Sequence, residues 1–207
     1  QSSGTMQTSG ALTAGDDVNI TSTNGAMTVD GDVTTSSGDI TLKSDGNMQT
    51  TGALTADNDV SITSTNGTMS IDGDVSTTTG DITLQSSGTM QTNGELTAAK
   101  NVKATADGAM TVSGAVTADD SVNITSTNGT MTIGGDVYAS TGDIALKSKK
   151  EMKTTGELTA NQNVNITSTD GTMIVDGDVS ATNGDIELQS KEAMKIEIGR
   201  ASCRERV

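Results

Sequence analysis

Apolar side chains alternate with polar ones in short runs along the whole chain. In one representative run, Val60 and Ile62 alternate with Ser61 and Thr63. Alternation over a few residues is typical of a β-strand that buries one face. The abundance of Thr and Ser and the scarcity of helix-forming residues favour strands and turns as well. The pattern therefore predicts many short strands and no helix.

The runs belong to a repeat of about 21 residues. All ten methionines form one series with steps of 21 and a single step of 20, namely Met6, Met27, Met48, Met69, Met90, Met110, Met131, Met152, Met173 and Met194. A second series consists of Leu12, Val33, Leu54, Val75, Leu96, Val116, Val137, Leu158 and Val179. A third consists of Gly10, Gly31, Gly52, Gly73, Gly94, Gly114, Gly135, Gly156 and Gly177. We interpret these series as stacked structural ladders, with the methionines buried in a packing column.

Adjacent repeats differ in character, so the longer period is 42 residues. The repeat 95–114 breaks this alternation and is one residue short. Each repeat has room for about three strands, centred on Val-x-Ile, on Met and on Leu/Val-Thr. Steps such as Asn66-Gly67, Asp30-Gly31 and Ser87-Gly88 predict turns in which glycine supplies a positive φ.

Three short strands cannot bury a core alone, but stacked repeats can, because each coil pairs with the next. We therefore expect an all-β protein, a single-stranded parallel β-helix (β-solenoid) of about nine coils of 20–21 residues, with right-handed winding. At about 4.8 Å between stacked strands, such a rod is roughly 43 Å long.

Residues 1–196 carry the repeat, and residues 197–207 do not. The latter hold every arginine and the only cysteine, Cys203, and one codon choice for them matches a common short-read sequencing adapter. We interpret 197–207 as adapter read-through and exclude it from the fold. The chain also starts and ends within a repeat, so we expect 1–196 to be an uncapped section of a longer rod.

Composition excludes several classes of protein. The formal net charge is −15, hydrophobic residues make up 31%, and Pro, His, Trp and Phe are absent. A large aromatic core is excluded. No apolar stretch is long enough to insert in a membrane, and no basic surface suits nucleic acid. Without histidine, and with one cysteine, the common zinc and thiol–imidazole sites cannot form, so we expect no cofactor.

Two polar columns are candidate binding surfaces. Stacked carboxylates could hold Ca²⁺, and the weak candidates for such a metal row are Asp39, Asp59, Asp81, Asp143 and Asp185. Asn101, Ser121 and Asn163 interrupt that row, so we favour aspartates that stabilise turns. The second column resembles an ice-binding face and consists of Thr21, Lys43, Thr63, Gln85, Thr105, Thr125, Lys147, Thr167 and Gln189. Its long Lys and Gln side chains prevent a flat match between this column and the ice lattice, so we favour a solvated face.

Other candidates carry less weight. Polysaccharide-cleaving enzymes also use parallel β-helices, but the carboxylates here recur as repeat positions and no long loop interrupts the period. We therefore predict no catalytic residue. Lys147, Lys149, Lys150 and Lys153 make one coil locally basic, for which we favour a solvated turn over a glycan or anionic partner. Tyr138 is the only aromatic residue, and we expect it to be exposed.

Two segments carry a resemblance to a known family. Residues 10–21, GALTAGDDVNIT, and residues 52–62, GALTADNDVSI, share Gly-x-Leu-Thr-Ala, a polar turn and Val-x-Ile. This pattern resembles the filamentous-haemagglutinin-type repeats of large secreted bacterial exoproteins and autotransporter passengers, and it covers residues 1–196. The resemblance implies a long β-helical stalk, an adhesive role and a location outside the cell or on the bacterial outer surface. The regular methionine column departs from that family pattern.

The sequence thus favours a repetitive stalk or passenger segment of an adhesin-like exoprotein, structural and with multivalent weak binding. We expect its host-surface or glycan ligand to bind through regions outside this section. An ice-binding β-solenoid is the alternative, and it predicts a contiguous threonine face on some side of the rod. A β-helical polysaccharide-active enzyme is the third interpretation.

Overall fold

The computed structural model describes residues 1–197 and shows an all-β protein of stacked coils. Three parallel sheets of ten, nine and nine strands run the length of the molecule, which is the predicted β-solenoid of about nine coils. The described part contains no helix, and hence none that could cross a membrane. Residues 198–207, which include Cys203 and most of the predicted adapter segment, lie outside the described residues.

Each coil contributes one strand to each of three faces. Face A consists of β3 (Val18–Ser22), β6 (Ile40–Ser44), β9 (Val60–Ser64), β12 (Ile82–Ser86), β15 (Val102–Ala106), β18 (Val122–Ser126), β21 (Ile144–Ser148), β24 (Val164–Ser168) and β27 (Ile186–Ser190). Face B consists of β1 (Met6–Thr8), β4 (Met27–Val29), β7 (Met48–Thr50), β10 (Met69–Ile71), β13 (Met90–Thr92), β16 (Met110–Val112), β19 (Met131–Ile133), β22 (Met152–Thr154), β25 (Met173–Val175) and β28 (Met194–Ile196). Face C consists of β2 (Leu12–Ala14), β5 (Val33–Thr35), β8 (Leu54–Ala56), β11 (Val75–Thr77), β14 (Leu96–Ala98), β17 (Val116–Ala118), β20 (Val137–Ala139), β23 (Leu158–Ala160) and β26 (Val179–Ala181).

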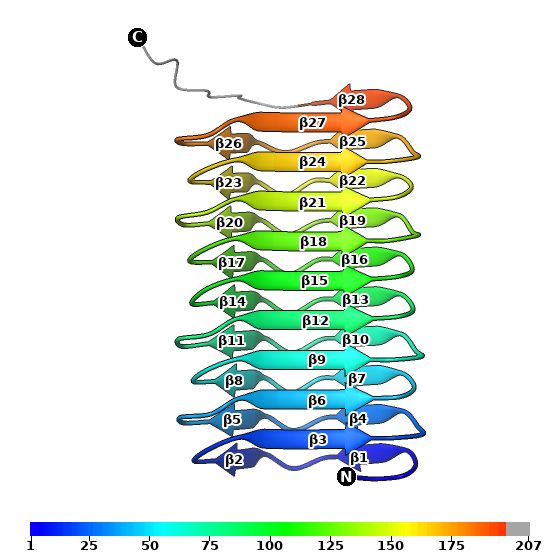
Figure 1. The fold of residues 1–207 in the computed structure, drawn as a ribbon, viewed down its shortest axis with the longest axis vertical. Helices are drawn as coiled ribbons and strands as arrows, with labels where there is room; N and C mark the ends of the chain where they lie inside the picture. Colours follow the sequence, from blue (N-terminus) through cyan, green and yellow to red (C-terminus); the bar gives the residue numbers. More distant parts are fainter. Residues whose placement is uncertain (198–207) are drawn as a thin grey trace.

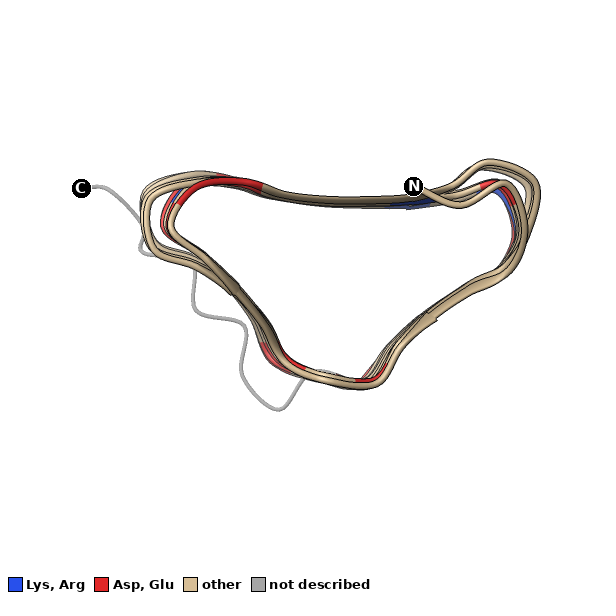
Figure 2. Cartoon of the chain, turned by 90° about the horizontal axis from the view of Figure 1, so that it is seen from below, with Lys and Arg blue, Asp and Glu red and all other residues tan. Residues whose placement is uncertain are grey.

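The chain climbs as a right-handed coil. In Figure 1 the strands of face A run from left to right in front, and those of faces B and C return from right to left behind, while the chain rises. Seen along its axis, the rod has a triangular outline with one long side and two shorter ones (Figure 2). We name the corners by the faces that they join, A/B, B/C and C/A.

The core consists of the predicted ladders. Each methionine pairs with the methionine of the next coil, as Met69 does with Met48 and Met90. The methionines from Met27 to Met173 are at most 2% exposed, which confirms the buried packing column. Leu54, Leu96 and Leu158 are fully buried in the same core, and Leu12 packs against it from the first coil. The ladders remove apolar surface from water without any aromatic side chain.

The 42-residue period arises from turns of alternating length. The C/A turn contains three residues in one coil (57–59) and four in the next (78–81), and the A/B turn alternates in the opposite sense (65–68, then 87–89). The longer turns protrude alternately at the two ends of face A (Figure 1). In the short repeat 95–114, the C/A turn (99–101) and the A/B turn (107–109) both contain three residues. The missing residue is therefore lost from a turn, and β15 stays in register with its neighbours.

Glycine serves a different purpose from the one predicted. No glycine of the described residues has a positive φ, so the expectation of left-handed turn residues at Gly31, Gly67 and Gly88 is wrong. Instead, the coils approach each other closely at the B/C corner. A Cβ on Gly52, Gly73 or Gly94 would overlap the backbone carbonyl of the glycine one coil earlier. The glycine ladder is required because no side-chain atom fits between stacked backbones.

Candidate functional site

The aspartates of the candidate metal row form a hydrogen-bonded ladder along the C/A corner. The carboxylate Oδ1 of Asp39 accepts the backbone N–H of Asp59 at 3.0 Å, and that of Asp59 accepts the N–H of Asp81 at 2.8 Å. Asp143 accepts the N–H and the Nδ2 of Asn163 at 2.8 and 2.9 Å. Each acid thus satisfies a backbone donor that the turn leaves without a sheet partner.

The residues that interrupt the acidic row continue the ladder. Asn101 Oδ1 accepts the N–H of Ser121 at 3.1 Å, and Ser121 Oγ accepts the N–H of Asp143 at 3.1 Å. The ladder ends with Asn163 Oδ1, which accepts the N–H of Asp185 at 2.9 Å. Aspartate, asparagine and serine are equivalent here because each places a side-chain acceptor oxygen against the N–H of the next coil. This geometry favours the turn-stabilising interpretation, and Ca²⁺ binding stays a prediction.

Between Gln1 and Glu197, no three side chains of the metal-ligating types Asp, Glu, His and Cys come together as a group that could hold an ion. The carboxylates are spread over all three corners of the rod (Figure 2). Successive coils place one carboxylate above another, but the Oδ1 atoms of the C/A row accept N–H groups of the next coil.

A second acceptor ladder, at the B/C corner, was missed by the sequence interpretation. Asp32 Oδ1 accepts the N–H of Ala53 at 2.9 Å, and Asp74 Oδ1 accepts the N–H of Glu95 at 2.9 Å. Asp136 does the same for Glu157 at 2.8 Å. These acids follow directly on ladder glycines, so the Gly-Asp pairs, which recur every second coil except across the short repeat, were the available signal.

A third ladder lies inside the rod. The last residue of most face A strands is a buried serine, and its hydroxyl donates to a carbonyl of the A/B turn. Ser86 Oγ donates to Gly67 O at 2.9 Å, and Ser126 Oγ donates to Gly108 O at 2.7 Å. In β15 the position is Ala106, which has no such donor. The signal in the sequence was the serine that ends each Val-x-Ile-x-Ser strand. It has the same alternating position as the Val and Ile side chains, which point inward.

Four threonine hydroxyls of face B have no partner. Thr8, Thr50, Thr92 and Thr154 point into the core, and their Oγ1 atoms are buried without a hydrogen bond. Their neighbours at the same position in adjacent coils are Val or Ile, such as Ile71 and Val112 beside Thr92. A buried hydroxyl without a partner costs stability.

The outward columns differ between faces. On face A the predicted column pairs as expected, with Thr21 beside Lys43 and Thr63 beside Gln85, so long side chains do interrupt it. Face C carries a more regular column that was not predicted as a binding face. It consists of Thr13, Thr34, Thr55, Ser76, Thr97, Thr117, Tyr138, Thr159 and Ser180. Tyr138, 45% exposed as expected, is its one long side chain.

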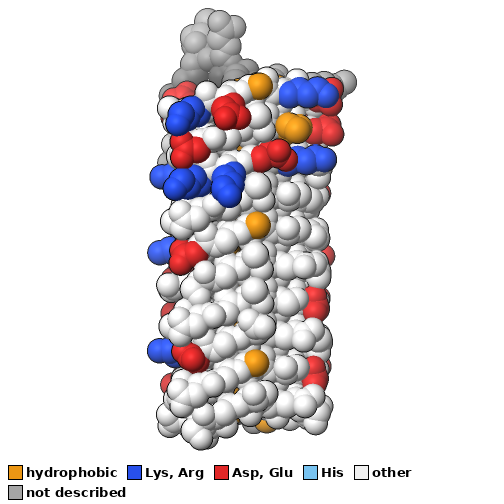
Figure 3. Space-filling view, turned by 90° about the vertical axis from the view of Figure 1, so that its right-hand side faces the viewer, with side chains coloured by type: hydrophobic (Ala, Val, Ile, Leu, Met, Phe, Trp, Pro, Cys, Tyr) orange, Lys and Arg blue, Asp and Glu red, His pale blue; other side chains and the backbone are white. Residues whose placement is uncertain are grey.

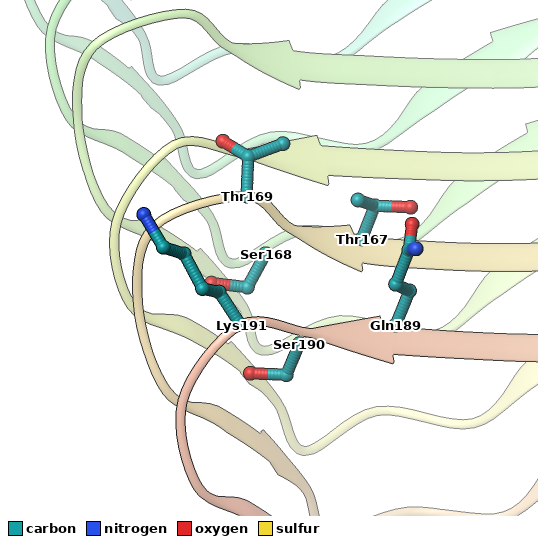
Figure 4. Close-up of a pocket in the computed structure, with 6 residues that line it drawn as sticks. All are labelled: Thr167, Ser168, Thr169, Gln189, Ser190 and Lys191. Carbon is teal, nitrogen blue, oxygen red and sulfur yellow. The ribbon is translucent and has the colours of Figure 1, made fainter.

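Shallow hollows lie along the edges of face A. One of them measures about 380 Å³ and lies at the A/B corner beside β24 and β27. Figure 4 shows its lining residues, which are Thr167, Ser168, Thr169, Gln189, Ser190 and Lys191. A second hollow of about 250 Å³ uses the equivalent positions near the start of the rod, including Thr21, Lys43 and Asp45. The lining consists of hydroxyl, amide, amine and carboxylate groups, in an arrangement that follows the repeat.

Comparison of the chain with family models, with curated proteins and with solved structures finds no match.

Proposed function

We propose that this chain is a section of the repetitive stalk of a secreted or surface-anchored bacterial exoprotein of the adhesin type. The observation that carries the proposal is the unbroken pairing of every face along the rod, from Met6 to Ile196 on face B. Each coil contacts its neighbours through the same ladders, so coils can be added without changing the cross-section. A stalk needs this property, because it must span distance with a simple repeat.

The turns support a structural role. Between consecutive strands of the described residues the turns contain three or four residues, so none builds a cleft over a face. The net charge of −15 keeps such a rod soluble and discourages association between rods. The resemblance of residues 10–21 and 52–62 to filamentous-haemagglutinin-type repeats supports export to the outer surface.

Sequencing the gene outward from both ends tests the proposal. We expect a long open frame with an export signal, further coils and a secretion module. We also expect a normal coil with glycine near position 198 in place of the segment 197–207. A short frame that is capped after a few coils would contradict the stalk function.

Face C supports a second candidate function, an ice-binding solenoid. Its column is Thr or Ser at every position except Tyr138, with about 4.8 Å between neighbours. Threonine rows on a rigid sheet present hydroxyl and methyl groups at a fixed repeat, which the interrupted column of face A does not.

Thermal hysteresis discriminates this candidate from the stalk. If face C binds ice, Thr55→Lys on that face abolishes hysteresis, whereas Thr63→Lys on face A leaves it intact. Both threonines project outward, Thr55 from the centre of β8 and Thr63 from the fourth residue of β9, so the two variants carry the same chemical change. Absence of hysteresis in the unmodified chain rejects ice binding and leaves the stalk proposal untouched.

A further inference from the structure

Positive charge is concentrated toward one end of the rod. Residues 1–146 contain Lys43, Lys100 and Lys103 as their only basic residues. The remaining lysines up to residue 197 are Lys147, Lys149, Lys150, Lys153, Lys191 and Lys195. Figure 3 shows that these side chains gather around the A/B corner and the adjoining part of face B, with carboxylates among them. We call this group the basic corner.

The basic corner has two levels of cations. At the lower level Lys147 projects from β21, Lys149 and Lys150 lie in the following turn, and Lys153 projects from β22. At the upper level, two coils later, Lys191 follows β27 and Lys195 lies in β28. All six lysines are exposed. Two coils correspond to about 10 Å along the axis, from the spacing of stacked strands.

Carboxylates neutralise the upper level more than the lower one. Lys191 donates to Asp170 at 2.7 Å, and this contact lowers the pKa of Asp170 and raises the pKa of Lys191. Lys195 pairs with Glu197 at 2.8 Å, which raises the pKa of Lys195. Across residues 1–197, the ion pairs are these two, and neither includes a lysine of the lower level. The charge of Lys149 also lowers the pKa of Asp170, and the exposed Glu151 lies in the same turn as Lys149 and Lys150. Lys147 and Lys153 lie on the strands beside that turn, so the lower level keeps cations available to an anionic partner.

The chemistry of the corner restricts the partner. Lysine presents a compact point charge without the planar fork of arginine, so it suits separate single charges on a flexible chain. The corner contains no aromatic residue on which a base could stack, and the acidic rod repels a nucleic-acid duplex with its dense phosphates. Ile174, which faces outward between Lys153 and Lys195 on face B, is half-buried and gives little anchorage in a lipid surface.

We propose that the basic corner binds a linear acidic polysaccharide that carries one carboxylate on every second sugar. Such a chain lies along the corner and places successive carboxylates against the two lysine levels. The acidic C/A and B/C corners repel the same chain and confine it to this edge of the rod. This inference concerns the surface of the rod itself and does not depend on the stalk function.

Fluorescence anisotropy with labelled hyaluronate oligosaccharides tests the proposal, with the full chain at low ionic strength. Two triple variants remove the same charge from different places. Lys149→Gln, Lys150→Gln and Lys153→Gln alter the basic corner, whereas Lys43→Gln, Lys100→Gln and Lys103→Gln alter the rest of the rod. All six side chains are exposed, so both variants keep the fold, and circular dichroism checks this.

We expect the corner variant to bind about fivefold more weakly than the unmodified chain, and the control variant to bind nearly as well as it. Binding should also weaken as salt rises to about 0.15 M, because exposed charges are screened. Three results overturn the proposal: no binding at low ionic strength, equal losses in both variants, or equal binding of uncharged dextran of the same length.

Discussion

At the scale of single residues, the most constrained positions are those where two backbones touch. Gly134 and Gly135 are adjacent in the sequence but differ in their surroundings. A Cβ on Gly135 would overlap the carbonyl oxygen of Gly114, whereas a Cβ on Gly134 would lie 3.7 Å from Val112 O, an ordinary contact. We predict that Gly135→Ala lowers the free energy of unfolding by about 3 kcal/mol through forced backbone movement. Gly134→Ala is the matched control and should change it little, and chemical denaturation measures both.

The unpartnered threonines give a second prediction at this scale. Thr92 is fully buried, its hydroxyl has no partner, and Ile71 and Val112 occupy the same position in the adjacent coils. Thr92→Val should therefore raise the free energy of unfolding by about 1 kcal/mol.

The control for that substitution is Thr77→Val on face C. Thr77 is also buried, but its Oγ1 donates to Gly80 O at 2.7 Å. Removing this hydrogen bond should lower the free energy of unfolding by about 1 kcal/mol. If both variants shift the denaturation midpoint in the same direction, hydrogen bonding does not distinguish the two sites.

At the scale of the structural element, the turns are stabilised by side chains that reach the next coil. Asp81 Oδ1 accepts both the N–H and the Nδ2 of Asn101. Asp81→Asn keeps an acceptor oxygen and should leave the melting temperature nearly unchanged, whereas Asp81→Ala should cost about 1 kcal/mol. Calorimetry with and without added Ca²⁺ completes the test. A Ca²⁺-dependent rise in melting temperature that Asp81→Asn abolishes would favour the metal row over the turn ladder.

The strands were predictable from the sequence because their signals are local. Alternation around Val60 and Ile62 places inward side chains, and the recurrence of methionine fixes the register of the coils. The purpose of the glycines was not predictable in this way. Glycine is required both for a positive φ and for the close approach of two backbones. Only the close approach depends on a backbone one coil away, which the local sequence does not show. The ladders through Asp32 and Ser86 were missed for the same reason, since their partners lie about 20 residues away in the chain.

At the scale of the whole molecule, the rod behaves as a one-dimensional stack. Two turn lengths alternate along it, and the short repeat 95–114 places three-residue turns at both ends of β15 without disturbing the pairing with β12 and β18. The stack therefore tolerates a change in turn length as long as the strands keep their register. The length of the rod can change by whole coils for the same reason.

We infer that coils add to the rod independently of one another, and small-angle X-ray scattering measures this. The measurement compares this chain with a variant in which the 42-residue unit 53–94 is duplicated in tandem. We expect a rod of roughly 43 Å that lengthens by about 10 Å, with an unchanged cross-sectional radius. An unchanged length, or a wider cross-section, would show that coils do not add independently.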